Sequence, residues 1–336
     1  FYETATGRKL SDVVPRVQYP TGGGSVAWNA DGSGVFYTRF PHPGERPAED
    51  ANFYQQVYFH QLGAPVAGDK YEIGKEVPRI AEINLEAGED GRYVLASVAN
   101  GDGGEFAHLL RDPSGKWRQI TRFDDQVKLA RFGRETRNGG ENALYLISRK
   151  GAPRGTVLRL PLPHASLANA TLIVPESGVV IDHLEPAAGG IYIEDMDGGP
   201  SGLRFYNLAS KKQTRLPVQG IISVQQMLSP RGNELLFRTI SFIDPYVWNE
   251  YVPGAGRKSV RPTQMRGTSP ADFSDVEVVR KFATSKDGTK VPLNIIRKKG
   301  TRLNGQNPTL LTGYGGYGVS RAPNFDFTRR LWLDQG

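Results

Sequence analysis

Two tyrosines set among four glycines near the end of the chain have the spacing best suited to chemistry. The stretch GYGGYG covers residues 313–318 and follows a short, mostly apolar run over 308–312. Glycine has no side chain and accepts most backbone conformations, so a glycine loop after a strand lets the backbone approach a ligand closely. We therefore expect a buried strand over 308–312 and a ligand-facing loop over 313–318.

Three interpretations of this loop compete. The glycine spacing matches G-x-G-x-x-G by count, but a dinucleotide fingerprint also needs a following helix and a βαβ unit, and the flanking sequence indicates neither. A plain glycine turn is the second interpretation. The third is a loop after an early strand of an α/β sheet, where hydrogen-bond donors face the oxyanion that forms on a substrate carbonyl. We favour the third.

The other residue types that could do chemistry are scattered. No G-x-S-x-G nucleophile turn occurs, and the serines beside glycine, Ser25, Ser33 and Ser201, fit turns better. The five histidines are expected in loops or at strand edges; they are His42, His60, His108, His164 and His183.

Metal and cofactor sites are not indicated either. The carboxylates of the stretch EDMDG over 194–198 lack the glycine and glutamate offsets of a calcium loop, so we expect a polar turn there. There is no cysteine, which excludes disulfides and thiolate metal sites. We expect no metal and no cofactor.

A repeated hairpin design organises most of the chain. An apolar stretch, a tight turn and a short basic strand recur over 1–10, 109–117, 205–212 and 247–258, and each copy is expected to be the last hairpin of a sheet. A second hairpin lies between them, with turns at 31–32, 90–91, 138–139, 189–190 and 231–232. The spacing of roughly 40 to 60 residues is that of a four-stranded propeller blade, which indicates about five blades.

The pattern changes between Pro262 and Asp275. Beyond that point, residues 276–283 and 291–296 are expected to pair as a hairpin across Lys286-Asp287-Gly288. We therefore predict a mainly β chain with two domains, a propeller over 1–270 and a second domain over 271–336.

The charge distribution and the apolar runs of the chain argue against two classes of binding partner. The net charge is +7, but lysine and arginine are scattered and the longest basic run is Arg297-Lys298-Lys299, so nucleic-acid binding is not expected. No apolar run approaches the length of a membrane span. We expect no membrane partner and a soluble protein of the cytoplasm or periplasm.

Four motifs taken together resemble a known family. KDGTKVP over 286–292, KKG over 298–300, LNG over 303–305 and GYGGY over 313–317 occur in the order and spacing found where the catalytic domain of prolyl oligopeptidases begins. The resemblance extends more loosely over the whole chain. It implies a seven-bladed β-propeller, incomplete at its N-terminal side here, followed by the start of an α/β-hydrolase domain whose catalytic triad lies beyond Gly336.

The resemblance also implies an activity and site residues. The activity is that of a serine endopeptidase that cuts short peptides after proline, with the propeller restricting access, and we expect a monomer. Tyr314 matches the tyrosine whose hydroxyl donates to the oxyanion. Tyr317 matches an aromatic wall of the proline pocket, where the family more often has phenylalanine, and Tyr19 matches a propeller aromatic that faces the substrate.

Two alternatives remain open. A related oligopeptidase that cuts after arginine or lysine shares this scaffold. A propeller without catalysis would act as a binding module, because a fold alone does not determine a function.

Overall fold

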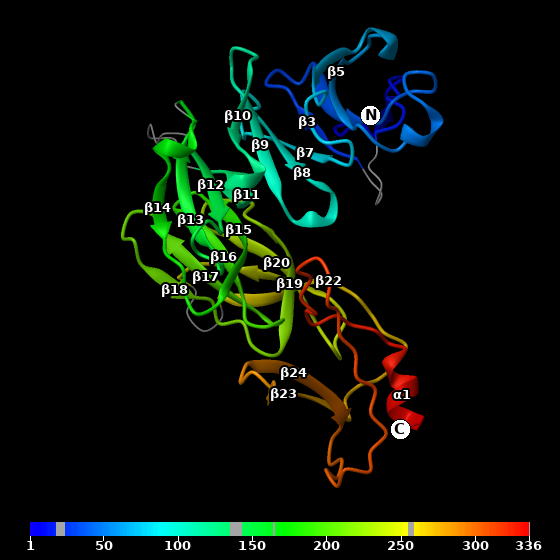
Figure 1. Cartoon of the computed structure of the whole chain (residues 1–336), viewed down its shortest axis with the longest axis vertical. Helices are drawn as coiled ribbons and strands as arrows, with labels where there is room; N and C mark the ends of the chain where they lie inside the picture. The colour runs from blue at the N-terminus through cyan, green and yellow to red at the C-terminus, as the bar shows by residue number, and fades with distance from the viewer. Residues whose placement is uncertain (18–23, 135–142, 164, 255–258, 336) are drawn as a thin grey trace. The chain divides into compact units, whose positions relative to one another are not determined.

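The computed structural model describes residues 1–17, 24–134, 143–163, 165–254 and 259–335, and their regular structure is almost entirely β (Figure 1). These residues form five four-stranded antiparallel sheets and two separate two-stranded hairpins. They divide into two compact units, one up to Pro175 and one from Glu176 onward. Within the described ranges, no helix is long and apolar enough to cross a membrane.

The first unit contains one short hairpin and three four-stranded sheets. In each sheet, strands that follow one another in the chain lie side by side. The hairpin pairs β1 (Tyr2–Glu3) with β2 (Arg8–Lys9). The sheets are β3 (Val26–Trp28), β4 (Gly34–Arg39), β5 (Gln56–Gln61) and β6 (Lys70–Ile73); β7 (Glu82–Ala87), β8 (Val94–Ala99), β9 (Phe106–Arg111) and β10 (Trp117–Thr121); and β11 (Val127–Phe132), β12 (Ala143–Ser148), β13 (Thr156–Pro161) and β14 (Thr171–Val174). Short 3-10 turns are η1 (Ala48–Asp50), η2 (Val66–Gly68), η3 (Gly101–Gly103), η4 (Phe123–Asp125) and η5 (Leu167–Asn169).

The second unit contains two further sheets, a long hairpin and one helix. The sheets are β15 (Val180–Ala187), β16 (Gly190–Met196), β17 (Ser201–Asn207) and β18 (Gln213–Arg215), then β19 (Ile222–Leu228), β20 (Leu235–Ser241), β21 (Val247–Tyr251) and β22 (Val260–Arg266). The hairpin pairs β23 (Val276–Thr284) with β24 (Lys290–Lys298). The helix α1 (Arg329–Gln335) has seven residues.

The apolar core lies between successive sheets of each unit. Every residue of β12 is buried, which suits a central strand covered on both faces. One apolar cluster joins β7–β10 to β11–β14 and includes Leu95, Leu110, Leu144, Leu146 and Leu160. Equivalent clusters join β3–β6 to β7–β10 and β15–β18 to β19–β22. Packing sheets face to face in this way removes their apolar side chains from water, which is the main term that stabilises such a fold.

The predicted hairpins are confirmed where the structure describes them. The stretches over 109–117 and 205–212 contain the last turn of their sheets, and 1–10 forms the β1–β2 hairpin. The stretch over 247–258 begins with β21, which pairs with the last strand of its sheet, β22; residues 255–258 lie outside the described residues. Four of the five predicted turns connect the first two strands of a sheet, and the turn at 138–139 lies outside the described residues. The hairpin over 276–296 also forms, with Val276 opposite Lys298 and Thr284 opposite Lys290.

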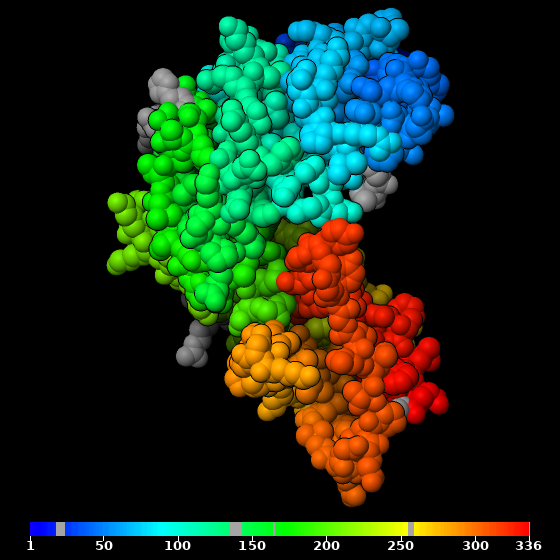
Figure 2. All heavy atoms as spheres, viewed as in Figure 1, coloured from blue at the N-terminus to red at the C-terminus, as the bar shows by residue number. Residues whose placement is uncertain are grey.

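The buried strand predicted over 308–312 is wrong. These residues form no strand, and every residue from 302 to 315 is exposed, with Leu311 at 81% and Leu310 at 62% of their full exposure. A buried strand needs hydrogen-bonded neighbours and a covered face, and the apolar run alone provides neither. In the space-filling view, the stretch after β24, coloured orange, stands at the surface (Figure 2).

Candidate active-site segment

The two predicted tyrosines lie in one exposed segment between β24 and α1. Tyr314 is 55% exposed and Tyr317 is 71% exposed. Both side chains are therefore open to solvent in this segment. The third predicted site residue, Tyr19, lies outside the described residues.

A tight turn sets the direction of the chain at Tyr317. Tyr317 and Gly318 have φ angles of 54° and 68°, and the Val319 amide donates to the Gly316 carbonyl at 3.1 Å. Two successive positive φ angles with this hydrogen bond form a type I′ turn. Glycine accepts that conformation freely but tyrosine does so rarely, so the turn holds Tyr317 in a conformation that costs backbone energy.

The glycines do not make the close approach that the sequence suggests. A Cβ atom added to Gly313, Gly315 or Gly318 would meet nothing within 4 Å. A Cβ on Gly316 would meet only the Tyr314 ring, at an ordinary contact distance of 3.8 Å, so among the described residues none of the four glycines is required by a close neighbour.

Beyond the tyrosines, the chain is attached to the last four-stranded sheet of the second unit, β19–β22. The buried Ser223 hydroxyl of β19 donates to the Pro323 carbonyl at 2.7 Å. Arg329 donates to the Phe242 carbonyl at 3.1 Å, which connects the start of α1 to the end of β20. The chain after the glycine loop thus becomes buried at Pro323.

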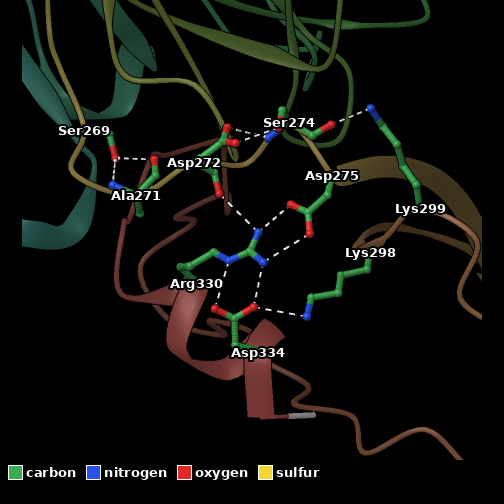
Figure 3. Close-up of polar contacts among 9 residues, drawn as sticks. All are labelled: Ser269, Ala271, Asp272, Ser274, Asp275, Lys298, Lys299, Arg330 and Asp334. Carbon is green, nitrogen blue, oxygen red and sulfur yellow. Dashed lines mark hydrogen bonds and ion pairs between the residues drawn. The ribbon is translucent and has the colours of Figure 1, made fainter.

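A charged cluster then fixes α1 against the chain before β23 (Figure 3). The Arg330 guanidinium makes two hydrogen bonds to Asp275 and two to Asp334, and it also donates to the Asp272 carbonyl. Lys298 of β24 forms an ion pair with Asp334 at 3.0 Å. Hydrogen bonds from Arg330, followed by those from Lys298, lower the pKa of Asp334 to about 2. Its carboxylate is therefore ionised over the whole range in which proteins normally work.

The serines and carboxylates that sequence reasoning weighed have structural partners. Ser25 donates to Asn84 of β7 at 3.0 Å, and Ser201 donates to Glu194 at 2.6 Å. Asp195 accepts two hydrogen bonds from Arg204 at 2.8 Å each. The carboxylates of the 194–198 stretch therefore bind different groups. Within the described ranges, no group of three histidines or carboxylates is placed to hold a metal ion.

Two histidines are not in loops or at strand edges, so that prediction is wrong for them. His60 on β5 and His108 on β9 are fully buried in the third strand of a four-stranded sheet. His60 lies 2.7 Å from Asp69 and 3.4 Å from Asp12, and the Tyr37 hydroxyl also donates to Asp69. This network connects the chain after β2 to the first four-stranded sheet. His164 lies outside the described residues.

The other two described histidines lie where the sequence predicts. His42 is in a loop, and His183 is on the edge strand β15. Burial lowers the pKa of His108 to about 4, so this residue is neutral near pH 7.

Sequence reasoning missed the residues that anchor the tyrosine segment. Arg330 and Asp275 are 55 positions apart, and no local pattern connects them. The polar turn predicted over 194–198 includes Gly198 but stops before Gly199. The only local signal for this contact is the glycine doublet after a strand, because two glycines leave room for another part of the chain to come close.

Comparison with known proteins shows which family this architecture resembles. The family described as prolyl oligopeptidase, N-terminal β-propeller domain, matches residues 1–264. Prolyl endopeptidase of Elizabethkingia meningoseptica is 24% identical over 338 residues, covering 99% of this chain and 46% of that protein. A dual function macrocyclase-peptidase of Amanita bisporigera is 25% identical over 335 residues, covering 94% of this chain and 43% of that protein. The chain thus spans about half the length of the curated relatives it matches.

Solved structures agree on the fold. A structure from a mechanistic analysis of two prolyl endopeptidases superposes with a TM-score of 0.83 at 21% identity, covering all of this chain and 48% of that one. Oligopeptidase B from Trypanosoma brucei, with covalently bound antipain, superposes with a TM-score of 0.76 at 19% identity, covering 97% and 45%. With the family match extending over 264 of 336 residues, the chain belongs to the prolyl oligopeptidase family through its N-terminal β-propeller domain.

Proposed function

We propose that this chain is part of a serine endopeptidase that hydrolyses short peptides on the C-terminal side of proline. The observation that carries the proposal is that relatives named prolyl endopeptidase align over 99% of the chain, and so extend past the propeller into the tyrosine segment. A propeller that served only as a binding module would have no need of that continuation. The partners are short proline-containing peptides, and the protein acts as a monomer without nucleic acid or membrane.

We extend the proposal to the architecture. The five four-stranded sheets are blades of a seven-bladed propeller, and the β1–β2 hairpin is the outer part of a further blade. The propeller covers residues 1–270, and residues 271–336 begin an α/β-hydrolase domain. Several large apolar side chains along 303–332 support this division, because a sheet domain normally buries such residues. They are Leu303, Leu310, Leu311, Leu331 and Trp332, which are between 47% and 81% exposed.

The two described tyrosines have different roles in this proposal. The Tyr314 hydroxyl donates a hydrogen bond to the oxyanion that forms on the scissile carbonyl, and this bond stabilises charge that exists only in the transition state. Tyr317 offers the flat face of its ring to the proline side chain of the substrate. Tyr19 contacts the substrate from the propeller side. No residue of the triad is assigned to the described part of the chain.

Tyr314→Phe in the full-length protein tests the central assignment. Removing one oxyanion donor typically lowers kcat by about 10²- to 10³-fold, and kcat/KM should fall with it while substrate affinity changes little. Tyr317→Phe is the matched control, because a pocket wall acts through its ring and should tolerate the loss of the hydroxyl. A change of less than about threefold for Tyr314→Phe would remove the oxyanion role.

Cleavage after arginine or lysine is the second candidate. It is retained because the family resemblance includes a related oligopeptidase with this preference on the same scaffold. Paired fluorogenic substrates that differ only in proline or arginine before the cut separate the two activities. A higher kcat/KM for the arginine substrate would overturn the proline assignment.

A further inference from the structure

The turn between β16 and β17 is shaped to receive the C-terminal part of the second unit. Gly198 and Gly199 have φ angles of +59° and +123°. A Cβ atom on Gly198 would lie 2.6 Å from Cγ of Pro292 on β24, and one on Gly199 would lie 2.8 Å from the Arg321 carbonyl oxygen. Real Cβ atoms do not come that close to other atoms, so a side chain at either position would displace β24 or the chain at Arg321.

Ser223, on the neighbouring sheet, binds the chain two residues after Arg321. It is 5% exposed, and its hydroxyl donates to the carbonyl of the buried Pro323 at 2.7 Å. The next amide along β19, that of Val224, donates to the Ser201 hydroxyl at 3.0 Å, and Ser201 in turn donates to Glu194 at 2.6 Å. Ser223 is therefore positioned by hydrogen bonds that connect two sheets.

Arg280 of β23 fixes the turn from the hairpin side. Its guanidinium donates to the Asp197 carbonyl and forms an ion pair with the Asp197 carboxylate at 3.4 Å. Three separate parts of the C-terminal region, β23, β24 and the chain at Arg321, thus meet the turn over 197–199.

These contacts lie on both sides of the tyrosine segment, at β23 and β24 before it and at Arg321 and Pro323 after it. No residue from 302 to 320 is buried, whereas Pro323 is. The exposed stretch that carries Tyr314 and Tyr317 is consequently held at its two ends, by β24 on one side and at Pro323 on the other. Freeing one end of a loop increases the range of positions that every residue within it samples.

We propose that Gly198, Gly199 and Ser223 form a seat that positions the tyrosine segment for catalysis. The inference rests on the proposed function, because it assigns these three residues as positioning residues that act through Tyr314. A displacement of about 1 Å in a catalytic group can lower a rate by about 10²-fold. The seat therefore contributes to the rate although none of its residues touches the substrate.

The experiment uses the full-length protein with Gly199→Ala and, separately, Ser223→Ala. The matched control is Gly202→Ala on β17, where an added Cβ meets nothing within 4 Å. Amide hydrogen exchange over 313–325 reports on the segment without any substrate. We expect faster exchange in both seat variants, no change in the control, and a fall in kcat of about 10- to 100-fold at nearly constant KM.

Each seat variant is then combined with Tyr314→Phe. If the seat acts through Tyr314, its effect on kcat nearly disappears in the Tyr314→Phe background, because the donor that it positions is already absent. Equal losses of kcat in both backgrounds, or unchanged exchange in both seat variants, would overturn the proposal. If exchange rises but Tyr314→Phe alone leaves kcat unchanged, the oxyanion assignment of Tyr314 fails and the catalytic role of the seat fails with it, whereas its anchoring of the segment stands.

Discussion

The buried acid Glu194 should make the stability of the protein depend on pH near neutrality. Glu194 lies on β16, is 6% exposed, and accepts a hydrogen bond from Ser201. Burial, opposed in part by that hydrogen bond and aided by the negative charges of Asp182 on β15 and Asp195 on β16, raises its pKa from 4.5 to about 7. Asp195 is itself paired with Arg204 of β17, and β19 presents the uncharged Val224 amide to Ser201.

The sign of the effect follows from the direction of this pKa shift. The folded protein binds the proton more tightly than the unfolded chain, so the stability that Glu194 contributes is full below about pH 4.5 and is lost as the pH rises through about 7. One pKa unit corresponds to about 1.4 kcal/mol, and the shift therefore corresponds to about 3 kcal/mol. Glu194→Gln removes the charge and keeps an oxygen that can accept from Ser201.

Chemical denaturation of the wild-type protein and the Glu194→Gln variant at pH 5 and pH 8 measures this contribution. We expect the variant to be more stable at pH 8 by about 3 kcal/mol and to differ little at pH 5. Glu76→Gln, at an exposed glutamate, is the control and should change the free energy of unfolding little at either pH. The reasoning is refuted if Glu194→Gln shifts stability equally at the two pH values, since a packing effect would do so and a titration would not.

Two further predictions concern the core and the helix α1. Leu146→Ala, at a fully buried position of β12, should lower the free energy of unfolding by about 2–5 kcal/mol, whereas Leu172→Ala, at a position 58% exposed, should cost less than about 1 kcal/mol; equal costs would contradict the core assignment. Arg330→Met leaves Asp275 and Asp334 without their guanidinium partner, so limited proteolysis over 326–335 should become faster, while the same substitution at the exposed Arg302 should have no effect; unchanged cleavage would show that packing alone holds the helix.

The sheets could be predicted from sequence because their signals are local. The turn glycines at 32 and 91 adopt φ angles of 68° and 67°, and each follows an aspartate in a connection between adjacent strands. Glycine at such a position selects the turn, and the strands on either side then pair with little further information. The β23–β24 hairpin forms around Lys286-Asp287-Gly288 for the same reason, and Gly288 has a φ of 85°.

The site could be predicted only in part, because its geometry depends on distant contacts. The tyrosine pair was visible as a pattern, yet Ser223 is 100 positions from Pro323 and Arg280 is 83 positions from Asp197. Neither serine nor arginine carries a local signal for its partner. The buried histidines show the same limit, since His60 is surrounded by Asp69 and Asp12 from two different connections.

Residues 276–298 and 308–312 are both rich in strand-forming residues, but only the first range pairs. In 276–298 each strand has its partner across the short connection over 285–289, so the backbone groups on the facing edges of the two strands pair with each other. The run over 308–312 has no such partner beside it in sequence, and its leucines are left 62% and 81% exposed. Its burial requires a sheet formed by more distant chain. Tyr314 follows this run after Gly313, and Gly199 and Ser223 of the seat hold the far side of its loop. In the proposed enzyme, the position of the Tyr314 hydroxyl depends both on such a sheet and on the contacts at Gly199 and Ser223, which is why we expect substitutions at the seat to weaken the proposed action of Tyr314 without abolishing it.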